Sequence, residues 1–418
     1  MSTSSSKPPK VSMIMAAYNA APFLEQSLGS LLDQTYTDFE ILCVDDGSTD
    51  DTVSTIEHVA STRPNGDKIR LLRTDHVGAG IARNIALQQA QGEYISFLDA
   101  DDFVDKQLLE KAVYKADTVQ ADIVIWDLWF YDHNTQIDQY PPVGTLTFSN
   151  FDDGDGVFTY TKNPDYIFNS FQNWIWNKLF RRSFLIEHEI TFPDFARTQD
   201  LQFTCLALVE AQRIAVIYER LSHYRINRGS SNMDTNDQHP LNFLDAFIAL
   251  KAELMQRGMY KIVQRSYVNW ALQSALANMF LQRRYSTFRE VFNALKEHGF
   301  DQMDITGHAT QKYIQCDIWL TEYHMILEQS PEDVLMYFTQ NLRTNEARGI
   351  TEINRLDRVL KQREDQIRQL SDTLETQRND IATLSTSLRN ITLSAEYRLG
   401  KKILLLPRLI KDLLTCHR

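Results

Sequence analysis

The sequence has 418 residues, of which 43% are hydrophobic and 23% are charged, as in globular proteins. This length predicts two or three domains. The formal net charge of −12 argues against a nucleic-acid-binding protein, which would usually present a basic surface. The four cysteines stand far apart, suggest no zinc site and favour a reducing, cytoplasmic environment. Residues 1–10 lack the apolar core of a signal peptide and are expected to be a disordered tail, and no run is long and apolar enough to span a bilayer.

Strand and helix patterns alternate at the start of the chain, and this order predicts an α/β fold with a parallel, doubly wound sheet. Helical periodicity separates apolar runs that are expected to be strands, at 11–17, 39–44, 69–72 and 95–98. The sequence then predicts strands at 121–126 and 214–218, a helix at 200–211, a polar region with short edge strands at 132–164 and a basic loop at 224–232. From 239 to 341 the pattern is helical throughout.

Acidic or glycine-rich clusters follow three of these apolar runs. Asp99 and Asp101, spaced i and i+2, are oxygen ligands that suit a shared divalent cation, whereas Asp102 would cap the next helix. Asp46 ends the second strand, and Arg83 follows a Gly-x-Gly that opens a helix, a combination that favours phosphate. Each cluster alone is also explained by a capped turn. Together, at the carboxyl ends of parallel strands, they predict a metal and nucleotide site in which the metal would bridge a diphosphate.

Five segments, in chain order, resemble the family 2 glycosyltransferases of the GT-A fold. They are residues 11–19 (VSMIMAAYN), 45–50 (DDGSTD), 82–84 (ARN), 92–95 (GEYI) and 98–102 (LDADD). The resemblance covers about 11–231. It implies a Rossmann-like, mostly parallel sheet with helices on both faces. It also implies an inverting transfer from a nucleotide-diphosphate sugar, most often a UDP-sugar, with Mn²⁺ or Mg²⁺, in enzymes that build bacterial cell-surface glycans.

The resemblance also assigns donor-binding roles by position. Ala17, Tyr18 and Asp46 would hold the nucleotide base, with Asp46 on the uracil edge. Asp99 would contact the ribose or a metal-bound water, Asp101 the metal, and Arg83 the nucleotide or its phosphates. Arg228 and Ser230 resemble a loop that closes on the diphosphate, while a structural role remains the alternative for the neighbouring Arg225.

An inverting transfer needs a general base on the acceptor hydroxyl. The family places it after an aromatic-Lys-Leu-aromatic segment, which here is 177–180 (NKLF), and the matching residue is Asp200. Its alternative role is an N-cap for the helix that follows. The acidic residue that the family has before the base is Gln199 here, which leaves the choice of acceptor open. Trp176, Lys178 and Gln199 are the candidates for acceptor binding, although core packing is an equal alternative for Trp176 or its neighbour Trp174.

The C-terminal part changes character. Apolar residues repeat every three or four positions from 353 to 391, with Arg363 and Gln377 in the seam, which favours a coiled coil and a homo-oligomer over an amphipathic helix packed on the body. Residues 397–411 are basic and apolar, as in segments that lie on an anionic membrane, although a helix packed on the protein is the alternative. The expected domains are a tail (1–10), a GT-A domain (11–231), a helical domain (232–345), the coiled coil (346–394) and a basic amphipathic tail (395–418).

These features together predict a glycosyltransferase that uses a nucleotide-sugar donor and a glycan, lipid-linked or polymeric acceptor. We expect it in the cytoplasm, peripherally bound at the inner face of the cell membrane. The alternative is a non-catalytic scaffold subunit that binds a nucleotide sugar and oligomerises through its coiled coil. A nucleotidyltransferase fits less well, because the N-terminal region lacks a Gly-rich signature followed by a lysine.

Overall fold

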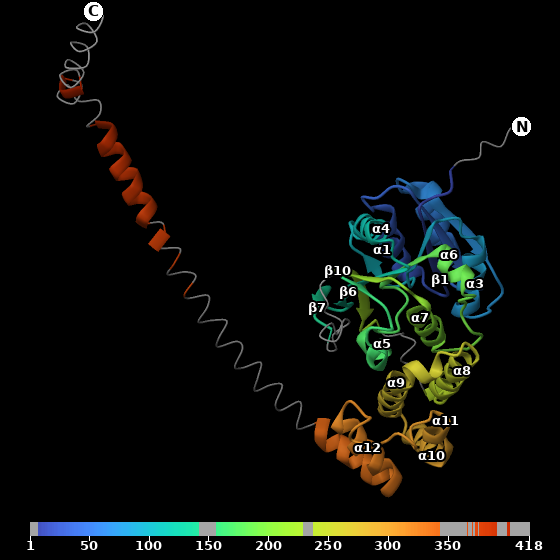
Figure 1. Cartoon of the computed structure of the whole chain (residues 1–418). Coiled ribbons are helices and arrows are strands. Elements are labelled where there is room, and N and C mark those ends of the chain that lie inside the picture. Colours follow the sequence, from blue (N-terminus) through green and yellow to red (C-terminus); the bar gives the residue numbers. More distant parts are fainter. Residues whose placement is uncertain are drawn as a thin grey trace, which may run out of the picture. The chain divides into compact units, whose positions relative to one another are not determined.

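The computed structural model describes residues 7–141, 156–228, 237–342, 366, 370, 373–374, 376–390 and 399–401. The chain divides into two compact units, 1–331 and 332–418 (Figure 1). The first unit contains the whole sheet and the helices up to residue 328.

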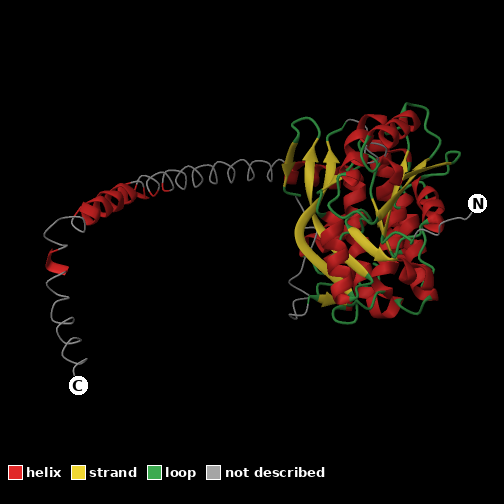
Figure 2. Ribbon diagram, turned by 90° about the horizontal axis from the view of Figure 1, so that it is seen from above, coloured by secondary structure: helices red, strands yellow, loops and turns green. Residues whose placement is uncertain are grey.

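A mixed ten-stranded sheet forms the centre of the first unit, in the order β3-β2-β1-β4-β9-β6-β10-β5, with β7 paired to β6 and β8 to β10. Helices flank its strands (Figure 2). The strands are β1 (Val11–Ala17), β2 (Phe39–Asp45), β3 (Ile69–Arg73), β4 (Tyr94–Phe97), β5 (Phe103–Val104), β6 (Ile123–Asp132), β7 (Ile137–Gln139), β8 (Val157–Phe158), β9 (Lys178–Arg181) and β10 (Ile214–Ile226).

The helices that follow or separate these strands are α1 (Ala21–Leu32), α2 (Thr52–Thr62), α3 (Ala79–Gln89), α4 (Leu108–Val119), α5 (Ile167–Ser170), α6 (Arg182–Glu187) and α7 (Gln199–Glu210). After β10 the first unit is helical, with α8 (Asn242–Gln256), α9 (Tyr260–Phe280), α10 (Tyr285–Ala294), α11 (Phe300–Gln302) and α12 (Asp317–Glu328). A π-helical turn at 295–299 joins α10 to α11. The helical pattern expected from 239 onward is thus confirmed, except at 303–316, where turns separate α11 from α12.

The four strands predicted first are parallel, as expected, with β1 between β2 and β4. The alternation of strand and helix patterns in the sequence therefore correctly predicted the parallel half of this α/β sheet. The sequence did not mark β9 as a strand, yet it lies antiparallel between β4 and β6. The expectation for β10 was too short. This strand continues past residue 218 through irregularities in its pairing with β6, so Tyr224 and Arg225 belong to a strand and not to the expected loop.

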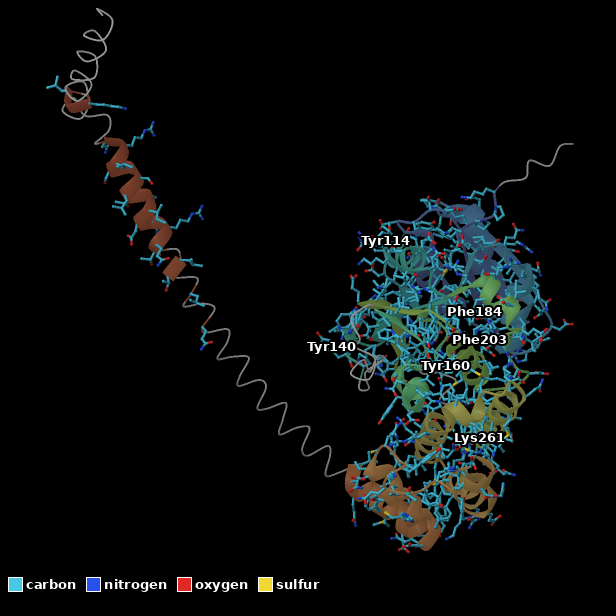
Figure 3. All side chains as sticks on the ribbon, viewed as in Figure 1. Tyr114, Tyr140, Tyr160, Phe184, Phe203 and Lys261 are labelled. Carbon is cyan, nitrogen blue, oxygen red and sulfur yellow. The ribbon has the colours of Figure 1, made fainter. Side chains whose placement is uncertain are left out.

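Alternate residues of the parallel strands bury on opposite faces of the sheet, as the period of two requires. On one face, the β1 residues Val11, Met13 and Met15 join a buried cluster with apolar residues of α1, α2 and α4. The opposite face is rich in phenylalanine. Phe203 of α7, labelled in Figure 3, stacks on Phe192 at 4.2 Å and meets the rings of Phe97 and Phe180 edge to face. This packing fixes α7 against β4 and β9, next to the edge where the predicted site lies.

The second unit contains a helix over 376–390. Leu374, before this helix, and Ile381 and Leu384, within it, belong to the predicted heptads and are each about two-thirds exposed. Most of the predicted coiled coil before residue 373, including Arg363, and most of 397–411 lie outside the described residues. No helix among the described residues is both long and apolar enough to cross a membrane.

Candidate active site

Three carboxylates gather where β4 ends. Asp99, Asp101 and Asp102 each offer one oxygen, and these atoms lie within 4.8 Å of one another. Asp101 is nearly buried, with 12% of its side chain exposed, whereas Asp99 has 30% exposed. Burial and the charge of Asp99 raise the pKa of Asp101 above its ordinary value. Three oxygen ligands at this spacing suit a divalent cation, which would offset the charge that the carboxylates impose on one another.

Asp102 does not cap a helix, contrary to our expectation. Helix α4 begins only at Leu108, and Asp105 instead accepts a hydrogen bond from the backbone N–H of Gln107 at 2.8 Å. The Oδ1 atom of Asp102 accepts the backbone N–H of Arg225 at 2.8 Å, and its buried Oδ2 has no hydrogen-bond partner in the described part of the chain. Burial, followed by the charges of Asp101 and Asp99, raises the pKa of Asp102 well above its usual range. A buried oxygen without a partner beside two carboxylates fits a cation site.

Arg83 connects this group to the predicted base. Its buried guanidinium, on α3, donates one hydrogen bond to Asp99 at 2.6 Å and another to Asp200 at 3.0 Å. Burial raises the pKa of Asp200 to about 6, an effect that the charge of Arg83 opposes. Asp200 is therefore ionised at neutral pH, and its pKa lies close enough to 7 for the carboxylate to accept a proton.

Helix α7 presents Asp200 at its start. Thr198, the residue before the helix, has a φ of 63°, a left-handed conformation that is unfavourable for a β-branched side chain. Among the described residues no side chain caps this N-terminus, so the N-cap role that was the alternative for Asp200 is not observed. Gln199 packs against α3, where a Cβ on Gly80 would lie only 3.2 Å from the Gln199 Cγ. The small residue at position 80 thus lets the two helices bring Arg83 and Asp200 together.

The expected base-binding residues lie where β1 and β2 end. Ala17 ends β1, and its carbonyl accepts the backbone N–H of Asp46 at 2.8 Å. The carboxylate of Asp46 is buried and accepts the backbone N–H groups of Val77 and Gly78 at 2.8 and 3.0 Å. Tyr18 is 47% exposed, and its ring stacks on His76 at 4.1 Å. The sequence reasoning missed His76, although its position two residues before Gly78 was a usable signal.

Two arginines, one on β10 and one just after it, approach the acidic triad of Asp99, Asp101 and Asp102. Arg225 is buried, donates to the main-chain oxygen of Asp101 and to Gln26, each at 2.6 Å, and lies over the ring of Phe23. These contacts give Arg225 the structural role that was its alternative. Arg228 forms an ion pair with the carboxylate of Asp101. Ser230 lies outside the described residues.

Two of the candidates for acceptor binding, Trp176 and Lys178, are buried and do not reach the surface. Trp176 is 3% exposed and stacks on Trp174 and Tyr224 with ring centroids 5.0 and 5.2 Å apart. Lys178 is fully buried, and its ammonium donates to the main-chain oxygens of Gln172 and Trp174 at 2.7 and 2.6 Å. Lys178 therefore holds the segment at 172–174 in place and does not face an acceptor. This finding corrects its expected role in acceptor binding. Burial and the Asp102, Asp99 and Asp101 charges raise the pKa of Tyr224, a site neighbour that the sequence did not reveal.

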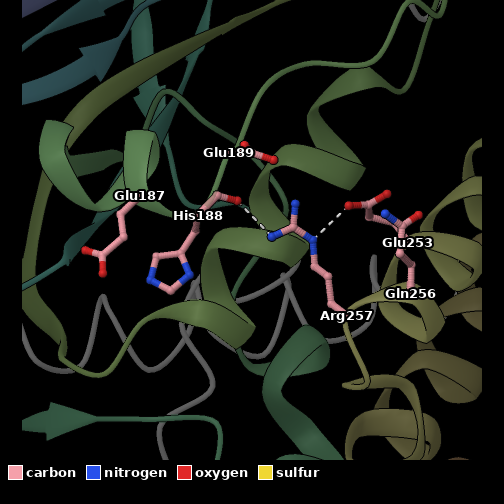
Figure 4. Close-up of a pocket in the computed structure, with 6 residues that line it drawn as sticks. All are labelled: Glu187, His188, Glu189, Glu253, Gln256 and Arg257. Carbon is pink, nitrogen blue, oxygen red and sulfur yellow. Dashed lines mark hydrogen bonds and ion pairs between the residues drawn. The ribbon is translucent and has the colours of Figure 1, made fainter.

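A separate polar hollow lies between α6 and α8 (Figure 4). Arg257 crosses it and donates to the main-chain oxygen of His188 and to Glu253, both at 2.8 Å. None of its lining residues belongs to the group around Asp101 and Asp200, so the hollow is distinct from the candidate active site.

Comparison with known proteins finds similarity to glycosyltransferases. Residues 12–188 match the family model described as "Glycosyl transferase family 2". The chain is 26% identical over 300 residues to the Staphylococcus aureus poly(ribitol-phosphate) beta-N-acetylglucosaminyltransferase TarS, covering 70% of this chain and 47% of that protein. It is 30% identical over 227 residues to the Bacillus subtilis uncharacterized glycosyltransferase EpsJ, covering 53% of this chain and 62% of that protein.

A solved structure has the same fold. The crystal structure of S. aureus TarS 1-349 in complex with UDP-GlcNAc aligns with a TM-score of 0.60 at 21% identity, over 79% of this chain and 92% of that one. The chain thus spans about half to three-fifths of the curated relatives named above. The family match ends before Asp200, and the structural likeness continues into the helical region. The chain therefore contains a domain, residues 12–188, that matches the family 2 glycosyltransferases and has a GT-A-like fold.

Proposed function

We propose that this protein transfers a sugar from a nucleotide-diphosphate sugar, with a UDP-sugar as the expected donor, to an acceptor hydroxyl with inversion at the anomeric carbon. The observation that carries the proposal is the bridge by which Arg83 contacts both Asp99 and Asp200. This bridge connects the carboxylates proposed to bind the donor through a cation, which include Asp99, with the carboxylate proposed as the base, Asp200. The names of TarS and its UDP-GlcNAc complex support UDP as the nucleotide.

Donor binding falls to the residues around the edge of β1, β2 and β4. Asp101, Asp99 and the unpartnered oxygen of Asp102 would hold Mn²⁺ or Mg²⁺, which supplies positive charge for the departing diphosphate. Tyr18 and Asp46 stand at the neighbouring strand ends, where such folds bind nucleotides. Arg228, beside Asp101, supplies a further positive charge for the diphosphate.

Asp200 acts as the general base in this proposal. Its carboxylate takes the proton of the acceptor hydroxyl as the acceptor oxygen bonds to the anomeric carbon. The bond from that carbon to the diphosphate oxygen breaks, and the nucleoside diphosphate leaves on the opposite face. Arg83 holds Asp200 in place and keeps it ionised above a pH of about 6.

The acceptor is a glycan, a lipid-linked glycan or a polymer. The polymeric substrates in the names of TarS and its relatives favour this class. Trp174 and Tyr224, which unlike Trp176 are only partly buried, are the better residues to meet a sugar ring. Gln199 at the start of α7 lies beside Asp200 and remains a candidate for acceptor binding.

The second unit is proposed to gather several catalytic domains. The exposed Leu374, Ile381 and Leu384 follow the heptad spacing, with the last two on the helix over 376–390, and they suit a second copy of the same chain. We keep the proposed limits of 11–231 for the transferase, 232–345 for the helical domain and 346–394 for the coiled coil. The tail at 395–418 would bring the protein to an anionic membrane from the cytoplasm.

A donor screen tests the proposal. The full chain is incubated with Mn²⁺ and, in turn, UDP-GlcNAc, UDP-glucose and UDP-galactose, and mass spectrometry follows UDP release. We expect slow hydrolysis of one donor, lost in Asp101→Asn. Tight binding of a donor without any UDP release, with or without glycan acceptors, would instead support the non-catalytic scaffold, for which Gln199 is the one departure in the motif.

A further inference from the structure

The carboxylate of Asp101 already carries a positive partner. Arg228, two residues after the end of β10, forms an ion pair with Asp101, and both side chains are mostly buried, with 18% and 12% exposed. The two residues are far apart in the sequence and meet because β10 pairs with β5, which follows the triad. Arg228 thus contacts a carboxylate oxygen of Asp101, the residue that the proposed function assigns to the metal.

The two nearby arginines differ in how firmly they are held. Arg225 has hydrogen bonds to main-chain and side-chain oxygens and lies against the rings of Phe23, Phe103 and Tyr131. Within the described part of the chain, Arg228 has one ion pair, with Asp101, and its buried Nε has no hydrogen-bond partner. Phe23 also lies under its guanidinium, 5.5 Å from the ring centre. Arg225 is therefore fixed in the fold, whereas Arg228 can leave Asp101 without breaking a network.

A divalent cation at the triad conflicts with this ion pair. A cation bound to either oxygen of Asp101 would lie within a few ångströms of the guanidinium, and like charges repel strongly in a mostly buried site. The guanidinium then needs another anion. A diphosphate bound to the same cation supplies one, in the planar, bidentate form that arginine recognises well.

We propose that Arg228 is an exchangeable counter-ion, which neutralises Asp101 in the donor-free protein and moves to the donor diphosphate when a divalent cation takes its place. This inference rests on the proposed function, because it requires the cation site. It makes Arg228 oppose cation binding in the absence of nucleotide and promote nucleotide binding in the presence of the cation. The two ligands are thereby coupled through one side chain.

The test measures binding and not turnover. Mn²⁺ affinity of the full chain is titrated by calorimetry and by electron paramagnetic resonance of free Mn²⁺, with and without UDP. In Arg228→Gln we expect Mn²⁺ alone to bind at least about fivefold more tightly, and UDP at saturating Mn²⁺ to bind at least about fivefold more weakly. Arg228→Lys, which keeps the charge, is expected to retain a Mn²⁺ affinity near that of the unmodified protein and provides a second variant if Arg228→Gln folds poorly.

A matched control is available on the same strand. Arg220→Gln removes a partly exposed arginine of β10 that pairs with Asp127, and it should change neither affinity. If Arg228→Gln binds Mn²⁺ with unchanged or lower affinity, the exchange is refuted while the proposed function stands. If the unmodified chain binds no Mn²⁺, and Asp101→Asn behaves identically, the cation site of the proposed function fails and the exchange fails with it.

Discussion

Replacement of Asp200 by Asn tests the centre of the proposed mechanism. Asparagine has nearly the same shape and keeps an oxygen that can accept the hydrogen bond from Arg83, but it cannot take up a proton at neutral pH. A general base contributes about a hundred- to ten-thousand-fold to the rate. We therefore expect the turnover of Asp200→Asn to fall by that factor, while the dissociation constant of the UDP-sugar stays within about threefold.

The pKa of Asp200 adds a pH dependence to this prediction. Because burial raises this pKa to about 6, only about a tenth of the base is ionised at pH 5, and kcat/KM of the unmodified protein should fall below pH 6. Asp200→Asn should show no such decline. The assay is UDP release between pH 5 and 8 with the donor found in the screen, and Asp194→Asn, an exposed carboxylate in the segment before α7, is the control that should behave normally.

The same pKa predicts a gain in stability. A carboxyl whose pKa rises from 3.8 to about 6 on folding binds its proton more tightly in the folded state. Its contribution is therefore most favourable below pH 3.8 and is lost as pH rises through about 6, which opposes folding at pH 7 by about 3 kcal/mol. Asp200→Asn should thus unfold at a higher temperature at pH 7. Near-normal turnover in this variant would refute the assignment of the base, and loss of donor binding would make Asp200 a binding residue instead.

Four further changes have expected outcomes. Arg83→Gln removes the charge that opposes the raised pKa of Asp200, so the acid limb of the kcat/KM profile should move to a pH above 6. Lys178→Met leaves two main-chain oxygens without their donor and should lower the free energy of unfolding in urea by about 2–4 kcal/mol, whereas Lys111→Met, at a surface ion pair, should lower it by less than about 1 kcal/mol. Deletion of residues 351–418 should reduce the mass seen by light scattering, and an unchanged mass would contradict the coiled coil. Full-length protein should float with anionic liposomes, and a chain ending at Ser394 should not; equal flotation would exclude the tail as the membrane contact.

The sequence by itself determined the parallel half of the sheet and the acids at its edge. Both are local features, because an apolar run of four to seven residues followed by Asp99 and Asp101 specifies a strand and what stands at its end. Strands that are parallel and adjacent must bring their carboxyl ends to one edge. The position of Asp46 beside Tyr18, after β2 and β1, therefore followed from the order of elements alone.

Only the tertiary structure decided which of these residues contact one another. The antiparallel strand β9, only four residues long, carried no clear strand pattern, yet its insertion between β4 and β6 buries Lys178 and removes it from the acceptor side. Arg83 and Asp200 are 117 positions apart and meet through the packing of α3 on α7 at Gly80. The pairing of β10 with β5 likewise brings Arg228 to Asp101 and the backbone N–H of Arg225 to Asp102. Contacts of this kind depend on packing between distant segments, and no local periodicity encodes them.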